Sequence, residues 1–119
     1  MATPNIVNVA TINAKNATGA VTTSRASAVD VPADKVAKIN TILVANVDGS
    51  NAADITIEVS VDNGSNFVAI AKTISVPADA TLVVSNTPIY LMEGDILKGG
   101  ASATGDLELF ITYEVLDDA

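Results

Sequence analysis

The 119-residue chain contains no cysteine, no histidine and no tryptophan. Without histidine or cysteine it lacks the commonest general base, the usual nucleophile–base pairs and the soft ligands of a zinc site. Catalysis would have to rest on carboxylates, lysine or tyrosine. We therefore expect that the protein is not an enzyme and that it has no catalytic, cofactor-binding or metal-binding residues. Disulfide bonds are excluded as well.

Aromatic and basic residues are scarce. The chain has two phenylalanines and two tyrosines, and its six lysines and arginines stand against fourteen aspartates and glutamates, a net charge of −8. Nucleic-acid recognition needs basic side chains for the phosphates or exposed rings for the bases, so we expect no nucleic-acid partner. The apolar runs are far too short to cross a membrane, and no basic segment followed by an apolar one opens the chain. Neither a membrane partner nor a secretory signal is expected.

Charged residues make up only 17% of the chain, whereas 49% are hydrophobic. This is apolar for a small domain, whose high surface-to-volume ratio demands polarity. Part of the excess is alanine, and the remainder indicates that neighbouring subunits cover some apolar surface. We expect a homo-oligomer or a larger assembly.

The stretch Lys38–Ile74 has the pattern of three β-strands joined by two polar turns. Its first strand is apolar on both faces, which is typical of a central strand or of a strand at a subunit contact. Its middle strand alternates between apolar and polar residues, so we expect one buried face and one outward face. The alternation sets Ile55, Ile57, Val59 and Val61 against Thr56, Glu58, Ser60 and Asp62.

Further short strands follow at residues 81–85, 89–91, 96–103 and 107–116, separated by turn residues. The last of them also alternates, and one of its faces is predicted to carry Leu107, Leu109, Ile111, Tyr113 and Val115. About eight strands with turns at this spacing predict an all-β fold, an antiparallel β-sandwich that is jelly-roll-like or immunoglobulin-like. We expect Phe67, Phe110 and Tyr113 to be the bulky residues of its core.

Two turn signals recur or stand out. Val31–Asp34 and Val76–Asp79 both read Val-Pro-Ala-Asp, and proline marks a strand end or corner because it cannot donate to a ladder. Two equivalent corners predict that the chain crosses between the sheets twice. Gly99 and Gly100 interrupt a strand and indicate a bulge or a close backbone approach.

Composition divides the chain into an extended N-terminal arm at residues 1–28 and a β-sandwich domain at residues 29–119. The arm is rich in Ala, Thr, Asn and Val, and Lys15 and Arg25 are its only charged residues. It could be a mobile terminus. Alternatively, it could pair with the sheet edge of a neighbouring subunit, a mode known as β-augmentation.

Three groups of residues are candidate sites, although turn chemistry explains the first two. Glu93 and Asp95 flank a glycine and form an acidic pair in a turn. Potential oxygen ligands for calcium occur in two loops. Two tyrosines are the weak basis for a carbohydrate-binding site. These alternatives correspond to a calcium- or glycan-binding lectin-like sandwich, and they involve Asp48, Ser50, Asp54, Asp62, Asn63, Tyr90 and Tyr113.

The order of these features resembles small virion proteins of tailed bacteriophages. The shared pattern is an apolar strand ending in Ala45–Gly49, an alternating strand, the corner Val76–Asp79, the turn Glu93–Asp95 and a closing strand that ends near Tyr113. It covers residues 31–116 and brings no functional residues with it, since such proteins act through surfaces.

The resemblance implies a capsid decoration or cement protein that stabilises the shell by binding the major capsid protein. A neck, tail or fibre component of the virion is the alternative. The implied partners are other virion proteins, and the implied location is the virion, assembled in the host cytoplasm.

Overall fold

Nine β-strands and no helix make up residues 9–118, the part of the chain that the computed structural model describes. The expected all-β class is confirmed. Within these residues no helix is long and apolar enough to cross a membrane. The strands are β1 (Val9–Ala20), β2 (Ala26–Asp30), β3 (Lys35–Asn46), β4 (Ala53–Ser60), β5 (Val68–Val76), β6 (Thr81–Ser85), β7 (Ile89–Leu91), β8 (Ile96–Ala101) and β9 (Leu107–Asp118).

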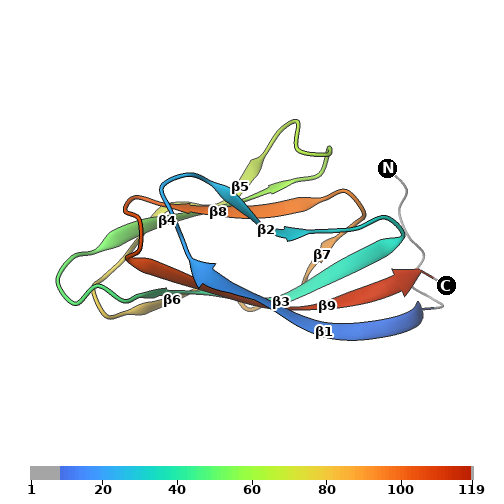
Figure 1. Ribbon diagram of the computed structural model, residues 1–119, viewed down its shortest axis with the longest axis horizontal. Coiled ribbons are helices and arrows are strands. Elements are labelled where there is room, and N and C mark those ends of the chain that lie inside the picture. Colours follow the sequence, from blue (N-terminus) through green and yellow to red (C-terminus); the bar gives the residue numbers. More distant parts are fainter. Residues whose placement is uncertain (1–8, 119) are drawn as a thin grey trace.

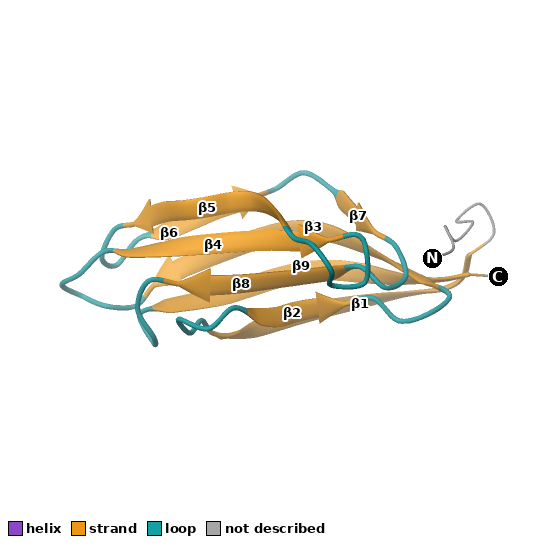
Figure 2. Cartoon of the chain, turned by 90° about the horizontal axis from the view of Figure 1, so that it is seen from above, coloured by secondary structure: helices purple, strands orange, loops and turns teal. Residues whose placement is uncertain are grey.

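The strands form two antiparallel sheets that face each other (Figure 1). Sheet A has the order β1-β9-β3-β6, and β7 also pairs with β3; sheet B has the order β2-β8-β4-β5, as seen in Figure 2. From β1 to β4 the chain changes sheet at each step, and it changes sheet again before β6, β8 and β9. A five-stranded and a four-stranded sheet connected in this way form a jelly roll, which decides between the two expected sandwich types.

The two Val-Pro-Ala-Asp segments are corners between the sheets, as predicted. Val31–Asp34 joins β2 of sheet B to β3 of sheet A, and Val76–Asp79 leads from β5 of sheet B to β6 of sheet A. In the second corner the N–H of Ala80 donates to the carbonyl of Pro77, closing a tight turn.

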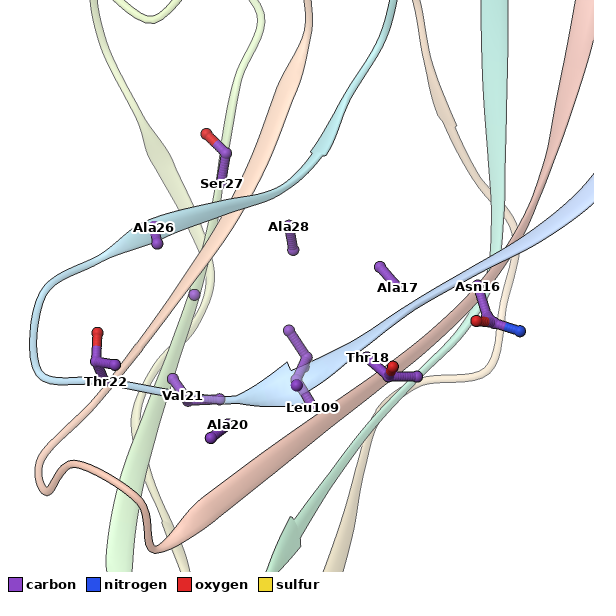
Figure 3. A pocket seen from close by; sticks show the side chains of 12 residues that line it. Asn16, Ala17, Thr18, Ala20, Val21, Thr22, Ala26, Ser27, Ala28 and Leu109 are labelled. Carbon is purple, nitrogen blue, oxygen red and sulfur yellow. The ribbon is translucent and has the colours of Figure 1, made fainter.

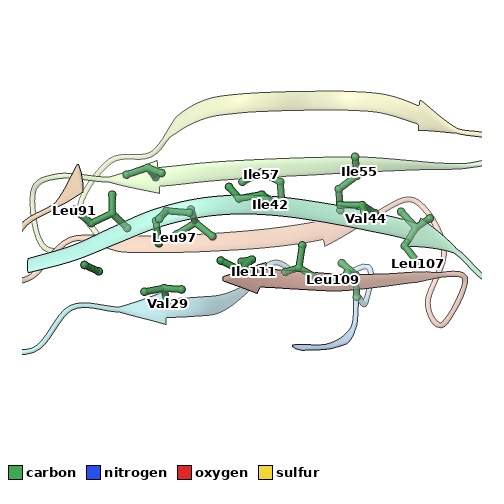
Figure 4. Packing of buried hydrophobic residues seen from close by; sticks show 14 of the residues in the cluster. Val29, Ile42, Val44, Ile55, Ile57, Leu91, Leu97, Leu107, Leu109 and Ile111 are labelled. Atoms are coloured by element: carbon green, nitrogen blue, oxygen red, sulfur yellow. The ribbon is translucent and has the colours of Figure 1, made fainter. Parts of the chain in front are cut away.

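Isoleucine, leucine and valine from the inner faces of both sheets fill the core (Figure 4). The predicted alternation of β9 is confirmed, because Leu107, Leu109 and Ile111 point inward. The expected aromatic filling is wrong for Phe67 and Phe110. Phe110 lies on the outer face of sheet A and Phe67 is half-buried on the outer side of sheet B, where the narrow interior is already filled by branched aliphatic side chains.

The expectation that the polar face of β4 looks out to water is also wrong. Thr56, Glu58 and Ser60 lie on the outer side of sheet B, but only 7%, 7% and 0% of their surfaces are exposed. Residues distant in sequence cover them. Arg25 reaches across the sheet to Glu58, and the N–H of Thr73 donates to the hydroxyl of Thr56. Both faces of β4 are therefore buried.

Residues 9–28, which the sequence assigned to the arm, contribute to both sheets of the same chain. Strand β1 pairs with β9 along its length, β2 pairs with β8, and Val21 between them is part of the core. Each of these two strands is thus hydrogen-bonded along one side to a strand of the same molecule. Residues 1–8 of the expected arm lie outside the described residues, and pairing with a neighbouring subunit stays a prediction.

Candidate functional site

One opening between the two sheets lies where their edge strands β1 and β2 face each other. It is a cavity of about 450 Å³. Ala28 of β2, together with Ala17 of β1 and Leu109 of β9, lies beside this space (Figure 3). Its lining is made of Ala, Gly, Val, Leu, Thr, Ser and Asn, with no titratable side chain among the lining residues described. The described lining therefore holds Ser and Thr hydroxyls but no side-chain acid or base beside them.

A charged cluster occupies the outer side of sheet B. Nη1 of Arg25 lies 3.0 Å from Oε2 of Glu58, and Nζ of Lys98 lies 3.7 Å from Oε1 of Glu58. The same Lys98 ammonium stands 3.8 Å from the centre of the Phe67 ring, a cation–π contact. Glu58 is thus a buried carboxylate with two cationic neighbours. The cluster ties the segment before β2 and the β4–β5 loop onto the sheet, and it leaves no free group for chemistry.

Gly100 makes this arrangement possible, since a Cβ atom there would lie 2.7 Å from Cγ of Arg25. A Cβ at Gly99 would lie 3.1 Å from Cδ1 of Ile57 on the inner side. The close approach predicted for this glycine pair is confirmed on both faces of β8.

The first calcium candidate is a self-capped loop. Oδ1 of Asp48 accepts hydrogen bonds from the N–H groups of Ser50 (2.8 Å) and Asn51 (3.2 Å). These two bonds, the Ser50 bond first, lower the pKa of Asp48. The N–H of Asp54 donates instead to Oγ of Ser102, 2.8 Å away. The Asp48 carboxylate therefore serves the turn that follows it.

The second calcium candidate behaves in the same way. The carboxylate of Asp62 accepts from the backbone N–H of Asn66 (2.9 Å), from its side-chain amide (3.0 Å) and from the hydroxyl of Ser60 (2.9 Å). These hydrogen bonds lower the pKa of Asp62. Asn63 and Gly64 both have positive φ angles, as expected for this turn sequence. No cluster of three acidic, histidine or cysteine side chains suited to a metal ion occurs in residues 9–118.

Glu93 and Asp95 have separate structural tasks. Oε2 of Glu93 accepts the N–H of Asp34, 2.9 Å away. Oδ2 of Asp95 accepts the N–H of Met92 (2.9 Å), while its Oδ1 is buried without a hydrogen-bond partner among the described residues. Each carboxylate therefore holds a turn, as the turn interpretation predicted.

The two tyrosines do not form a shared platform. Tyr90 pairs with Lys38 and projects from the outer face of sheet A, whereas Tyr113 is opposite the fully buried Ile39 and packs against the core. They lie on opposite faces of one sheet. Of the two tyrosines, only Tyr90 presents an exposed ring.

The feature that sequence reasoning missed is an apolar row on the outer face of sheet A. Leu43 of β3 is directly opposite Val83 of β6 on one side and Phe110 of β9 on the other. Val83 and Phe110 are 51% and 43% exposed. A hollow of about 510 Å³ beside the row includes Leu43, Phe110 and the small residue Ala45 in its lining. We call Leu43, Val83 and Phe110 the outer apolar row.

A signal for this row was present in the sequence. Phe110 interrupts an otherwise polar face of β9, and β3 is apolar on both faces. The row itself depends on the register of three strands that are distant in sequence, and that register comes from the tertiary structure.

No family model matches the sequence, and no curated protein matches it. Among solved structures, the chain is similar to a protein of Bacillus endospore appendages, which form a family of disulfide-linked pili. The TM-score is 0.56 at 13% identity, over 92% of this chain and 88% of that one. At this identity the likeness shows the fold alone.

A weaker likeness links the chain to a pentameric capsid protein isolated from metagenomic phage sequences. The TM-score is 0.41 at 15% identity, and the match covers 86% of this chain and 60% or 64% of that protein in two structures. This likeness is too low to support an argument about function.

Proposed function

We propose that this protein is a structural component of a bacteriophage virion, a capsid decoration or cement protein that binds the major capsid protein. Binding only to the assembled lattice would lower the free energy of that state and so stabilise the shell by mass action. Such a protein needs a compact domain and a contact surface, and it needs no active site.

The observation that carries the proposal is the outer apolar row. Three large apolar side chains, Leu43, Val83 and Phe110, are aligned across three strands on a protein with a net charge of −8. Exposed apolar side chains gathered in one place are typical of a surface that another protein covers. The sequence resemblance to small virion proteins of tailed phages supplies the kind of partner.

The proposal is tested with density-gradient-purified particles from the source of the sequence. We expect the protein to co-purify with particles in a stoichiometry equal to that of the capsid protein or its capsomers. Its absence from purified particles would refute a virion role. One ring of copies per particle would instead indicate a neck or tail component.

The contact surface is tested with two matched variants. Phe110→Ser and Tyr90→Ser each remove an aromatic side chain from the outer face of sheet A, with exposures of 43% and 46%. We expect Phe110→Ser to reduce particle binding at least tenfold, whereas Tyr90→Ser, which lies outside the outer apolar row, binds normally. Equal binding by both variants would remove the row from the proposal.

A fibre or appendage component is the second candidate, and the fold likeness to an endospore appendage protein supports it. Those appendages are disulfide-linked, whereas this chain contains no cysteine. Contacts between copies would then be non-covalent. Electron microscopy of the purified protein would show filaments if this candidate holds.

A further inference from the structure

The outer strands of the two sheets differ in how well they could accept another strand. Strand β2 has five residues and a register shift, β6 has five residues and a register shift, and β7 has three residues. Strand β5 is longer, but its pairing with β4 shifts twice. It also carries Lys72 and a left-handed Thr73 (φ 48°). Short strands, bulges and lysines are the devices that keep sheet edges from pairing with other chains.

Strand β1 lacks most of these devices. From Ile12 to Ala20 it pairs with β9 one residue to one residue without any shift, and no other described strand pairs with its far side. This stretch contains no proline, and Lys15 is its only charged residue. It is the longest regular free edge in the described sheets.

One hydrogen bond fixes which backbone groups of β1 point outward. The N–H of Val21 donates to the carbonyl of Leu107 at 2.9 Å, so Val21 and Leu107 are a hydrogen-bonded pair. Such pairs alternate with non-bonded pairs along an antiparallel ladder. Odd-numbered residues of the regular stretch therefore bond to β9. The N–H and C=O groups that point to the free edge belong to Ile12, Ala14, Asn16, Thr18 and Ala20.

From these observations we infer that a second copy of this chain pairs along the free edge of β1, antiparallel, about a two-fold axis that passes midway between Asn16 and its copy. Sheet A then continues across the dimer as β6-β3-β9-β1 followed by the same strands in reverse. This inference deepens the proposed function by naming the self-contact of the assembly unit. A two-fold interface is the commonest symmetry of homo-oligomers, because one surface satisfies both partners.

The register follows from the edge itself. Centring on Asn16 pairs the whole stretch Ile12–Ala20 with its copy, and the five outward-pointing residues form five pairs that each exchange two hydrogen bonds. Lys15 then lies opposite Ala17 of the second copy, so the two lysines do not face each other directly. The other side chains at the seam are neutral and mostly small, which matters between two copies that each carry a charge of −8.

Proline substitutions can test the free edge of β1 independently of its hydrogen bonds to β9. Asn16→Pro removes an N–H that points outward, and proline is tolerated at such edge positions. We expect light scattering after size exclusion to show a twofold fall in mass, from dimer to monomer, with little change in melting temperature. Ala14→Pro should have the same effect, and Asn16→Ser should remain dimeric. Lys15→Pro should instead lower the melting temperature, because it removes a backbone hydrogen bond to β9.

Cysteine cross-linking tests the register, since the wild-type chain has no cysteine. Across a hydrogen-bonded pair the Cα atoms are about 5.5 Å apart, within reach of a disulfide. We expect Asn16→Cys to form a covalent dimer on oxidation. Thr18→Cys is the matched control, because its copy would lie more than about 13 Å away along the strand and the variant should stay monomeric under denaturing conditions.

Three results would overturn the inference: a monomeric wild-type chain at its highest soluble concentration, a dimeric Asn16→Pro variant, or equal cross-linking of the two cysteine variants. A monomer whose β1 edge amides resist hydrogen exchange would show that the same chain covers this edge. Particle binding is read separately through Phe110→Ser. A monomeric Asn16→Pro variant that still binds particles leaves the proposed function intact, and a cross-linked dimer that binds no particles leaves this inference intact.

Discussion

Asp34 and Asp79 adopt the same left-handed backbone conformation, with φ angles of 63° and 58°. Each ends a Val-Pro-Ala-Asp corner that carries the chain from sheet B to sheet A. Few residue types other than glycine enter this region readily, and aspartate is one of them because its short polar side chain can bond locally. The repeated tetrapeptide therefore encodes a repeated backbone geometry.

This geometry predicts how Asp79 responds to substitution. Asp79→Ala keeps the left-handed strain without a polar side chain to offset it, so we expect the free energy of unfolding to fall by about 1 kcal/mol. Asp79→Gly should stay within about 0.5 kcal/mol of wild type, because relief of strain offsets the greater freedom of the unfolded chain. Urea denaturation measures both, and equal effects of the two substitutions would contradict the explanation. The same pair of variants at Asp34 repeats the test.

Gly100 is predicted to be required for the side chain of Arg25 to cross sheet B. In Gly100→Ala the new Cβ would overlap Cγ of Arg25, 2.7 Å away, and overpacking of this kind costs about 1–3 kcal/mol. In an Arg25→Ala background the same substitution should be nearly neutral, since the obstructing atom is gone. A double-mutant cycle measured by thermal or urea unfolding gives the coupling. Additive effects would show that Arg25 does not lie over Gly100.

Asn46 at the end of β3 is a buried amide whose donors and acceptor are all used. Its Nδ2 donates to the carbonyls of Asn51 and Val76, both at 2.9 Å, and its Oδ1 accepts the N–H of Asp48 at 2.8 Å. Asn46→Asp would place a carboxylate against two carbonyl oxygens at a site that is 3% exposed. We expect a loss of about 3 kcal/mol at neutral pH.

The pH dependence of Asn46→Asp provides its control. Burial beside two carbonyls would raise the pKa of the introduced carboxyl above its unfolded value, so the penalty exists at high pH and is relieved as the pH falls through the folded-state pKa. The unfolding free energies of variant and wild type should therefore approach each other on acidification. A gap that stays constant with pH would argue against a buried charge.

The lowered pKa values of Asp48 and Asp62 predict an acid-sensitive contribution to stability. A carboxyl whose pKa is lower in the folded state binds fewer protons there than in the unfolded state. It therefore stabilises the fold at pH values above its ordinary pKa of about 3.9. That contribution disappears as the pH falls further. We expect Asp62→Asn to be less stable than wild type at pH 7 and to converge with it on acidification below about pH 3, as followed by urea midpoints. A difference independent of pH would contradict this origin.

Local pattern was sufficient for most of the strands. The alternation in β4 and β9, the polar turns and the paired corners predicted an antiparallel sandwich, and the observed bounds of β6 and β7 coincide with the expected residues 81–85 and 89–91. Strand β1 was not predicted as a single long strand, because the sequence analysis placed its residues within an extended arm at residues 1–28. Its small and polar residues give a weak periodic signal, and its position is set by pairing with β9, about a hundred residues away in sequence.

The candidate sites also differ in whether local sequence was enough to predict them. Asp48, Asp62, Glu93 and Asp95 were read as turn residues, and each accepts hydrogen bonds in the turn or loop that it holds. The bonds of Asp48, Asp62 and Asp95 are local, so residue type and spacing were enough to indicate them. The bond of Glu93 reaches Asp34, 59 residues earlier, and depends on the tertiary structure. The outer apolar row could not be read in this way, because Leu43, Val83 and Phe110 meet only through strand register.

By itself, the sequence determined the class of fold, the places where the chain turns and the absence of histidine and cysteine chemistry. These depend on the period of two in a strand, on the backbone preferences of Pro, Gly and Asp, and on which side chains are present. The tertiary structure decided which faces are covered. It buried Glu58 beneath Arg25, moved Phe110 to the outside and left one edge of β1 without a neighbour among the described strands, because burial depends on which distant segments pack together.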